Sequence, residues 1–127
     1  MKPLRILVVE DDVTIGPLLA ELLEELGHFV CAVEVDAVNA VAAAARHRPD
    51  LMIVDVGLGD ESGVLAVTEI LRHGFVPHVF VTGDALRNLS LGPGAVLIQK
   101  PFRGPDIVVA IQRAIRGPKR EAIDARI

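Results

Sequence analysis

The sequence predicts an α/β fold in which a doubly wound, five-stranded parallel sheet is covered by helices on both faces. Short apolar runs alternate with segments of helical periodicity along the 127 residues, which is the pattern of repeated strand–helix–strand units. The runs are continuously apolar, as in strands buried on both faces. Several of them end in charged or hydroxyl side chains, and in such sheets the functional site lies at the carboxyl ends of the strands.

Five runs are expected to form the strands, and glycine, proline or charged residues separate them from the helical segments. The expected strands are residues 6–9, 29–35, 51–55, 79–81 and 95–98. The third has the sequence Leu-Met-Ile-Val-Asp, so it ends in the carboxylate of Asp55.

Helices are expected after the first three strands and after the fifth, because apolar residues there recur at intervals of three and four. Asp36 is placed to cap the second helix, and Gly27 and Gly117 are placed to end the first and the last. The residues expected to face the core are Ile15, Leu18, Leu19, Leu22 and Leu26, then Val38, Val41, Ala42 and Ala45, then Val64, Val67, Thr68 and Leu71, and finally Ile107, Val108, Ile111, Ala114 and Ile115.

Length and composition indicate one globular domain, residues 1–117, followed by a short charged tail, residues 118–127. The hydrophobic content of 51% excludes a disordered chain. No apolar run is long enough to cross a bilayer, and no signal-peptide pattern is present, so we expect a soluble, cytoplasmic protein.

The net charge of −4 and the lack of tryptophan and tyrosine argue against direct binding to nucleic acid or a membrane surface. A single cysteine excludes a disulfide framework. The four histidines lie at the boundaries of the expected elements and away from the acidic strand ends. We expect His28, His47, His73 and His78 to face solvent and to bind no ligand.

Carboxylates gather at the ends of two strands: Glu10, Asp11 and Asp12 follow the first, and Asp55 ends the third. Two carboxylates about 4 Å apart repel by roughly 4 kcal/mol at an effective dielectric constant of 20, so a cation or a proton must relieve the repulsion. Oxygen ligands without histidine or cysteine favour Mg²⁺. Asp12, directly before the first helix, is better suited to capping than to binding metal.

Thr82 and Lys100 stand at the ends of the fourth and fifth strands and add a hydroxyl group and a positive charge. Taken singly, Asp55 or Thr82 could belong to a turn, and Lys100 could be a solvated surface residue. It is less plausible that four such residues stand independently at the strand ends of one sheet than that they form one site. Together the residues indicate phosphoryl transfer with a carboxylate as the acceptor.

Over residues 4 to about 116, the chain resembles the receiver domain of two-component response regulators. The resemblance implies a flavodoxin-like sheet with strand order 2-1-3-4-5. The matching segments are residues 6–12 (Ile-Leu-Val-Val-Glu-Asp-Asp), residues 51–55 with Gly63 eight residues later, Phe80-Val81-Thr82-Gly83, and Lys100-Pro101-Phe102.

The resemblance implies that Asp55 accepts a phosphoryl group from a phosphohistidine on a histidine kinase or phosphotransfer protein. Asp11, Asp55 and the backbone carbonyl of Gly57 would hold Mg²⁺, and Glu10 would contribute directly or through water. Such a protein catalyses its own Mg²⁺-dependent phosphorylation and dephosphorylation and is not an enzyme acting on a separate substrate.

The resemblance also implies that Lys100 pairs with a phosphoryl oxygen, while Thr82 hydrogen-bonds another and draws its loop inward as the signal. The Lys100–Pro101 peptide bond would be cis and would aim the lysine into the site.

Three features depart from the family. Gly59 replaces a frequent proline, so we expect a looser loop. Leu97 replaces a common aromatic residue, which puts the usual output mechanism in doubt. The interval from Thr82 to Lys100 is short and contains Gly92-Pro93-Gly94, so the fourth helix is expected to be shortened or absent. We therefore hypothesise that partner proteins dock on the first helix or on the loops around Asp55.

Because the chain stops soon after the last helix, we expect a single-domain regulator that signals through protein–protein contacts. Two alternatives stay open. One is a degenerate receiver that acts as a phosphorylation-independent interaction module. The other, a small Mg²⁺-dependent phosphatase or flavin-binding relative, is weaker, because no phosphate-cradling glycine loop follows the first strand and no second acid stands two residues after Asp55.

Overall fold

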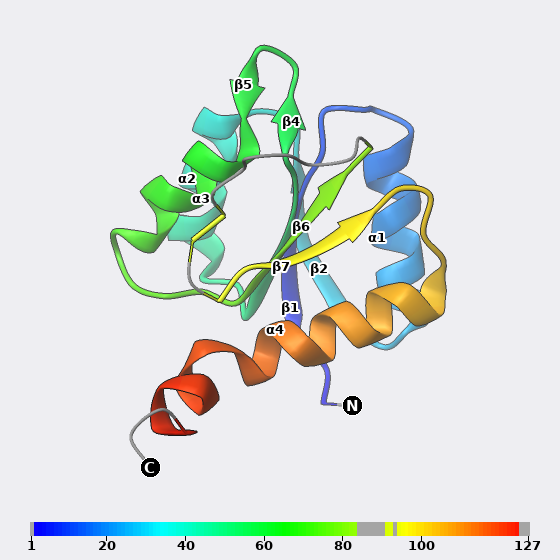
Figure 1. Ribbon diagram of the computed structural model, residues 1–127. Helices are drawn as coiled ribbons and strands as arrows, with labels where there is room; N and C mark the ends of the chain where they lie inside the picture. The colour runs from blue at the N-terminus through cyan, green and yellow to red at the C-terminus, as the bar shows by residue number, and fades with distance from the viewer. Residues whose placement is uncertain (1, 84–90, 93, 125–127) are drawn as a thin grey trace.

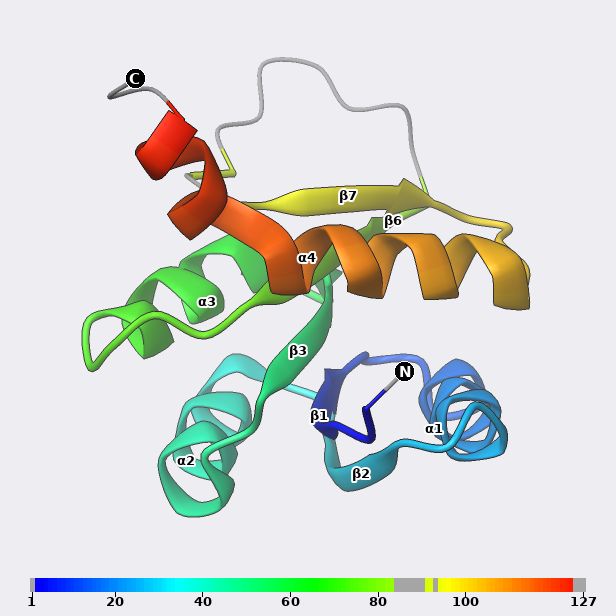
Figure 2. The ribbon, with the colours of Figure 1, turned by 90° about the horizontal axis from the view of Figure 1, so that it is seen from below.

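The computed structural model describes residues 2–83, 91–92 and 94–124. A parallel sheet of order β2-β1-β3-β6-β7 forms the centre, with helices on both faces (Figures 1 and 2). The strands of this sheet are β1 (Arg5–Val9), β2 (Phe29–Glu34), β3 (Leu51–Asp55), β6 (His78–Thr82) and β7 (Val96–Gln99). Counted along these strands the order is 2-1-3-4-5, which confirms the predicted fold.

Four helices and a small hairpin complete the described part of the chain. The hairpin consists of β4 (Gly57–Leu58) and β5 (Glu61–Ser62), which pair antiparallel. The helices are α1 (Ile15–Glu25), α2 (Ala37–His47), α3 (Gly63–Leu71) and α4 (Gly104–Asp124). None of these described helices is long and apolar enough to cross a membrane.

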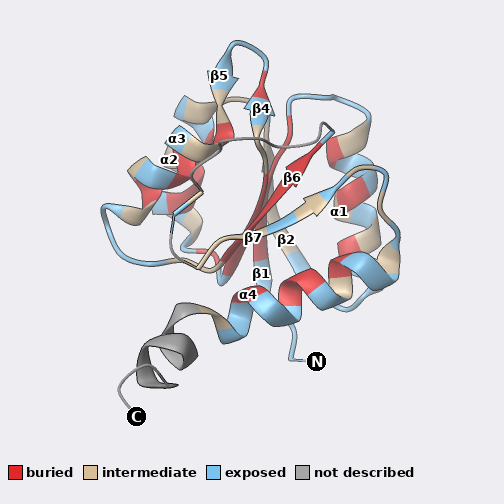
Figure 3. Cartoon of the chain, viewed as in Figure 1, coloured by how far each residue is buried: buried red, intermediate tan, exposed pale blue. Residues whose placement is uncertain are grey.

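Alternate residues of the strands divide the core into two layers. Ile6, Ile53 and Val79 face α1 and α4, whereas Val54 and Phe80 face α2 and α3. Figure 3 shows the three central strands, β1, β3 and β6, in the red of buried residues, whereas the edge strands β2 and β7 are tan and pale blue. The central strands are therefore buried on both faces, as their continuous apolar runs predict.

The predicted core faces of α1 and α2 were partly wrong. Leu18 is 59% exposed and Val38 is 74% exposed, while the core contacts come from Leu19 and Leu23 of α1 and from three alanines of α2. Both helices carry apolar residues on more than one side, so periodicity alone does not select the buried side. In α2 the small alanines, Ala40, Ala43 and Ala44, let the helix pack close to the sheet.

The predicted cap of α2 at Asp36 is confirmed, and α4 breaks at the predicted Gly117. The Asp36 carboxylate caps α2 by accepting a hydrogen bond from the Asn39 amide at 2.8 Å. Gly117 has non-helical backbone angles (φ 30°, ψ −148°), so α4 breaks there and then continues to Asp124. The assignment of residues 118–127 to a tail outside the domain stays a prediction. The expected shortened fourth helix falls on residues 84–90, which lie outside the described residues.

Two histidines were wrongly predicted to face solvent. His28 is buried, and its Nδ1 accepts a hydrogen bond from the Leu4 amide at 3.1 Å. His78 is fully buried with Nδ1 2.8 Å from the Val76 carbonyl oxygen, and its Nε2 has no hydrogen-bond partner in the described structure. Both imidazoles pair with backbone groups next to the starts of strands, and burial lowers both pKa values.

Candidate functional site

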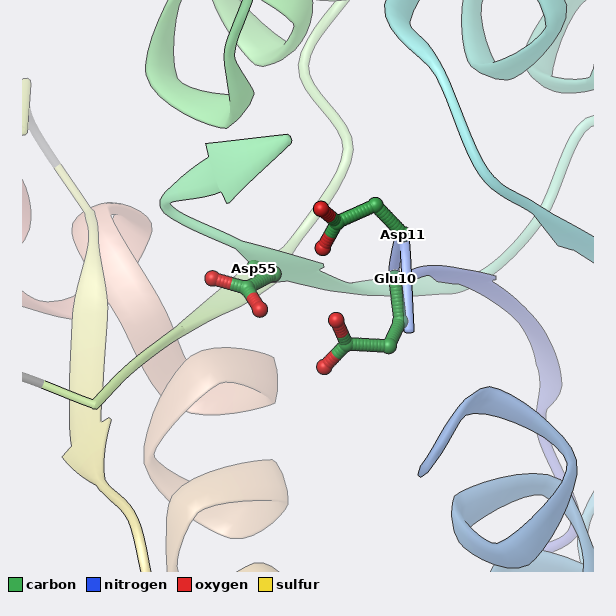
Figure 4. A group of neighbouring side chains, drawn as sticks. All are labelled: Glu10, Asp11 and Asp55. Atoms are coloured by element: carbon green, nitrogen blue, oxygen red, sulfur yellow. The ribbon is translucent and has the colours of Figure 1, made fainter. Parts of the chain in front are cut away.

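Three carboxylates meet at the carboxyl edge of the sheet because two of its strands are neighbours in register. Val9 of β1 lies beside Val54 of β3, so the residues that follow, Glu10 and Asp55, lie beside one another. Oxygen atoms of Glu10, Asp11 and Asp55 all lie within 4.8 Å of each other. Figure 4 shows the three side chains converging from the two strand ends. Glu10 is buried, Asp55 is half-buried and Asp11 is exposed.

Lys100 joins the two more buried carboxylates. Its Nζ lies 3.0 Å from Glu10 Oε1 and 2.9 Å from Asp55 Oδ2. The Lys100 amide donates to the Thr82 carbonyl oxygen at 2.7 Å, and the Lys100–Pro101 peptide bond is cis, as predicted. Burial lowers the pKa of Lys100, but hydrogen bonds to both carboxylates outweigh it, so the net pKa is raised. The lysine is held in its charged form at the centre of the site.

Glu10 is a carboxyl group with an altered proton affinity. Burial first, and then a hydrogen bond with Asp55, raise its pKa from 4.5 to about 7, against the lowering effects of Lys100 and the Asp12 amide. The Asp12 amide donates to Glu10 Oε2 at 3.2 Å. At neutral pH without metal, Glu10 is therefore partly protonated, and this relieves part of the repulsion expected between the carboxylates.

The backbone beside Asp55 is tightly packed at Gly63, where α3 begins. A Cβ at position 63 would lie 2.9 Å from the Asp55 carbonyl carbon and would overlap its carbonyl oxygen. Only glycine therefore lets α3 start this close to the end of β3. Sequence reasoning noted Gly63 only as part of a family match. A glycine directly before an apolar helical segment and shortly after an acceptor carboxylate could have indicated this role.

The segment after Asp55 contains regular structure that was not predicted. Residues 57–62 form the β4–β5 hairpin, in which Gly59 supplies a positive φ of 63°, and the looser loop expected from Gly59 stays a prediction. The Gly57 amide donates to Asp55 Oδ1 at 3.0 Å. On the other side, Glu61 Oε1 accepts from the Ala37 amide at the start of α2 at 3.1 Å. The hairpin thus connects the Asp55 carboxylate with α2.

The remaining predicted residues occupy the same edge or its surroundings. Asp55 is in register with Val81, so Thr82 follows directly on the neighbouring strand, where it is buried. Asp12 accepts hydrogen bonds from the Thr14 and Ile15 amides at 2.8 and 3.1 Å, which confirms its predicted capping role. Leu97 lies on β7 and is 38% exposed.

Comparison with known proteins identifies the family. The model of the response regulator receiver domain matches residues 6–112, and the chain belongs to this family. The transcriptional regulatory protein PdtaR of Mycobacterium tuberculosis is 36% identical over 118 residues, covering 89% of this chain and 57% of PdtaR. The phyllosphere-induced regulator PhyR of Methylorubrum extorquens is 36% identical over 115 residues, covering 87% of this chain and 43% of PhyR.

Solved structures agree with this assignment. The solution structure of the PhyR receiver domain of Erythrobacter litoralis matches with a TM-score of 0.75 and 28% identity, covering 91% of this chain and 92% of that domain. The anti-anti-sigma factor PhyR of Bartonella quintana matches with a TM-score of 0.77 and 27% identity, covering 53% of that protein. The chain spans about half the length of the curated relatives named above.

The acidic cluster fits the divalent cation that receiver domains bind. Glu10, Asp11 and Asp55 offer hard oxygen donors within 4.8 Å of one another, without a nitrogen or sulfur ligand. Mg²⁺ prefers such ligands and keeps several waters, which leaves positions for phosphoryl oxygens. Receiver domains are signalling modules, and their common chemistry at such an acidic pocket explains why charged groups gather at this one edge.

Proposed function

We propose that this protein is a cytoplasmic response regulator that accepts a phosphoryl group on Asp55 from a phosphohistidine of a sensor histidine kinase or phosphotransfer protein. The observation that carries this proposal is the placement of Asp55, with its Oδ2 2.9 Å from Lys100 Nζ, beside Glu10 and Asp11 at the carboxyl edge of the sheet. A nucleophilic carboxylate, a cation and a pocket for Mg²⁺ are the parts that phosphoryl transfer to an aspartate requires.

In the transfer step, a carboxylate oxygen of Asp55 attacks the phosphorus atom and forms an O–P bond. The bond from phosphorus to the donor's imidazole nitrogen breaks, and that nitrogen keeps the electron pair and takes up a proton. Lys100 then exchanges its contact with the Asp55 carboxylate for one with a phosphoryl oxygen. Attack by water on phosphorus later releases inorganic phosphate and restores the Asp55 carboxylate.

Four oxygen donors are proposed to hold Mg²⁺: the side chains of Glu10, Asp11 and Asp55 and the backbone carbonyl of Gly57. The bound cation would supply positive charge that offsets the negative oxygens of the phosphoryl group. Thr82, at the end of the neighbouring strand, is proposed to hydrogen-bond the phosphoryl group and to draw its own loop toward the site.

Intact-mass measurement tests the proposal. The protein is incubated with Mg²⁺ and acetyl phosphate, and we expect one added phosphoryl group on the wild type and none on Asp55→Asn. Asp60→Asn is the matched control, because Asp60 is an exposed carboxylate in the hairpin that follows the site. Wild-type protein that binds Mg²⁺ but takes up no phosphoryl group would contradict the proposal and favour a phosphorylation-independent interaction module.

The N-terminal part of α1 is the surface that we propose for docking of the phosphodonor. Val13 and Leu18 are 79% and 59% exposed, and they lie close in sequence to Glu10 and Asp11. We expect Leu18→Ala to slow transfer from a phosphorylated kinase while leaving labelling by acetyl phosphate unchanged. The control is Leu65→Ala on α3, which removes an equally apolar side chain that is 70% exposed. Equal effects of the two variants would contradict this docking surface.

A further inference from the structure

A groove of about 540 Å³ lies between the C-terminal ends of α2 and α3, on the part of the molecule that the proposed function does not use. Its apolar lining includes Val41 of α2, Ile70 of α3, and Phe75 and Val76 of the loop before β6. Pro49, which precedes β3, also lines it. The groove is therefore at the amino edge of the sheet, about 13 Å along β3 from Asp55 at roughly 3.3 Å per residue.

His78 supports the wall of the groove that Phe75 and Val76 form. The His78 ring is 5.7 Å from the Phe75 ring between centroids, and its Nδ1 lies 2.8 Å from the Val76 carbonyl oxygen. Opposite this wall, Ala44 and Ala45 leave room because their side chains are small. Phe75 itself is 46% exposed, so an aromatic ring is left partly in water at the mouth of the groove.

One cation, Arg48, and one imidazole, that of His73, lie at the mouth of the groove and indicate the charge of the occupant. The chain has a net charge of −4, yet Arg48 and His73 both line this apolar groove. Helix dipoles favour basic residues at the ends of α2 and α3. Within the described residues, however, neither of these two side chains has a hydrogen-bond or ion-pair partner. An occupant with an apolar face would cover the apolar lining of the groove, and carboxylates on that occupant would pair with the side chains at its mouth.

The openness of the groove indicates the kind of occupant. Arg48, His73, Gly74 and Phe75 are all exposed on its rim, whereas pockets for small molecules bury about 70–90% of the ligand surface. An amphipathic helix needs only an apolar groove for its anchor side chains and leaves its other face in water. We propose that this groove docks an acidic amphipathic helix of a partner protein, independently of phosphorylation at the opposite edge.

Titration of the full chain with a model peptide, followed by NMR of the backbone amides, tests the proposal. The probe is a 14-residue helix of leucine and glutamate with leucines at positions i, i+3, i+4 and i+7. We expect shifts at Val41, Ile70, Phe75 and Val76, and about tenfold weaker binding of the same peptide with lysine in place of glutamate. Equal binding of the two peptides, no binding of either, or shifts confined to α1 or α4 would overturn the proposal.

Matched variants separate the groove from general charge effects. Arg48→Glu is expected to weaken binding of the acidic peptide about fivefold or more, because its side chain lines the groove. Arg46→Glu makes the same charge change in the last turn of α2, at a residue that does not line the groove, and should have little effect. Equal losses in the two variants would overturn the proposal.

Three further measurements address the role of Phe75, the identity of the partner and the independence from phosphorylation. Phe75→Ala removes a half-exposed ring, so the fold should survive while peptide binding falls. Sedimentation of the wild type without peptide should show a monomer. If the wild type self-associates and Phe75→Ala abolishes the self-association, the occupant of the groove is a second copy of this chain and the proposal is wrong. Binding should also change less than about twofold after treatment with Mg²⁺ and acetyl phosphate, given the separation along β3. A larger change would refute the independence.

Discussion

The two edges of the sheet use buried ionisable groups in opposite ways. At the carboxyl edge, burial raises the pKa of Glu10 to about 7, and Lys100 lies 3.0 Å away as a compensating cation. At the amino edge, burial lowers the pKa of His78, and its Nε2 lacks any partner among the described residues. Desolvation favours the neutral form of both groups, but at the carboxyl edge Glu10 also has Asp11, Asp55 and the Lys100 cation beside it. This contrast is consistent with the two proposals, phosphoryl transfer at the carboxyl edge and apolar recognition at the amino edge.

The largest expected effect comes from closing the space beside Asp55. In Gly63→Ala the new Cβ would overlap the Asp55 carbonyl group, so α3 or β3 must move, and the free energy of unfolding should fall by about 4 kcal/mol or more. Chemical denaturation measures this. The control is Gly57→Ala, where nothing lies within 4 Å of the added Cβ, and a change within about 0.5 kcal/mol is expected. Similar stabilities of the two variants would contradict the close approach at Gly63.

Removing the cation of the carboxyl edge should separate catalysis from metal binding. In Lys100→Ala, phosphorylation by acetyl phosphate should slow by roughly a hundredfold, because a charge that stabilises the phosphoryl oxygens is lost. Mg²⁺ should bind at least as tightly, since Lys100 no longer pairs with Glu10 and Asp55. Arg103→Ala, an exposed residue near the same loop, should alter neither quantity. Weaker Mg²⁺ binding in Lys100→Ala would show that the lysine organises the metal site instead.

The acid at the carboxyl edge should make the metal-free protein less stable as pH rises. The folded-state pKa of Glu10 is raised from 4.5 to about 7, so the folded state binds more protons than the unfolded state between these values. Stability measured in EDTA should fall from pH 5 to 7, by at most about 1.4 kcal/mol per pH unit from this group. Glu10→Gln should remove this part of the slope. Asp12→Asn should act only at lower pH, because amide hydrogen bonds lower the Asp12 pKa.

The amino edge should show a slope of opposite sign. Burial lowers the folded-state pKa of His78, so its contribution is complete above about pH 6.5 and is lost as pH falls toward the folded-state value. As pH falls from 7 to 5.5, the unfolding free energy of the wild type should therefore decrease relative to that of His78→Leu. An unchanged difference would show that the His78 pKa is not lowered.

The carboxyl edge could be predicted from the sequence because parallel strands end at a common edge. Once residues 6–9 and 51–55 are strands, Glu10 and Asp55 must meet, and the register of Val9 with Val54 bears this out. The fold was predicted from the alternation of apolar runs with helical segments, and the family was predicted from the motifs at the strand ends. The ion pair between Lys100 and Glu10 joins residues 90 positions apart, and only the order of the strands makes that contact foreseeable.

What the sequence did not reveal depends on packing between distant side chains. His78 looks like a boundary residue, and its burial follows from the rings of Phe75 and Phe80, 5.7 and 5.3 Å away. The sequence did not show which side of α2 is exposed, because the alanines and valines of this helix are similar in hydropathy. The fit of the side chains against the sheet decides which of them are buried. The β4–β5 hairpin has strands of two residues, too short for any alternation of apolar and polar residues to be visible.

Mapping the phosphorylated residue tests the central claim most directly. The protein is labelled with Mg²⁺ and acetyl phosphate, the acyl phosphate is reduced with borohydride to homoserine, and peptides are sequenced by mass spectrometry. We predict homoserine at position 55 alone, because Asp55 is an aspartate of the acidic cluster whose carboxylate lies 2.9 Å from the Lys100 ammonium group. Homoserine at Asp11 or Asp60, or no modified peptide from protein that binds Mg²⁺, would contradict the proposed role of Asp55.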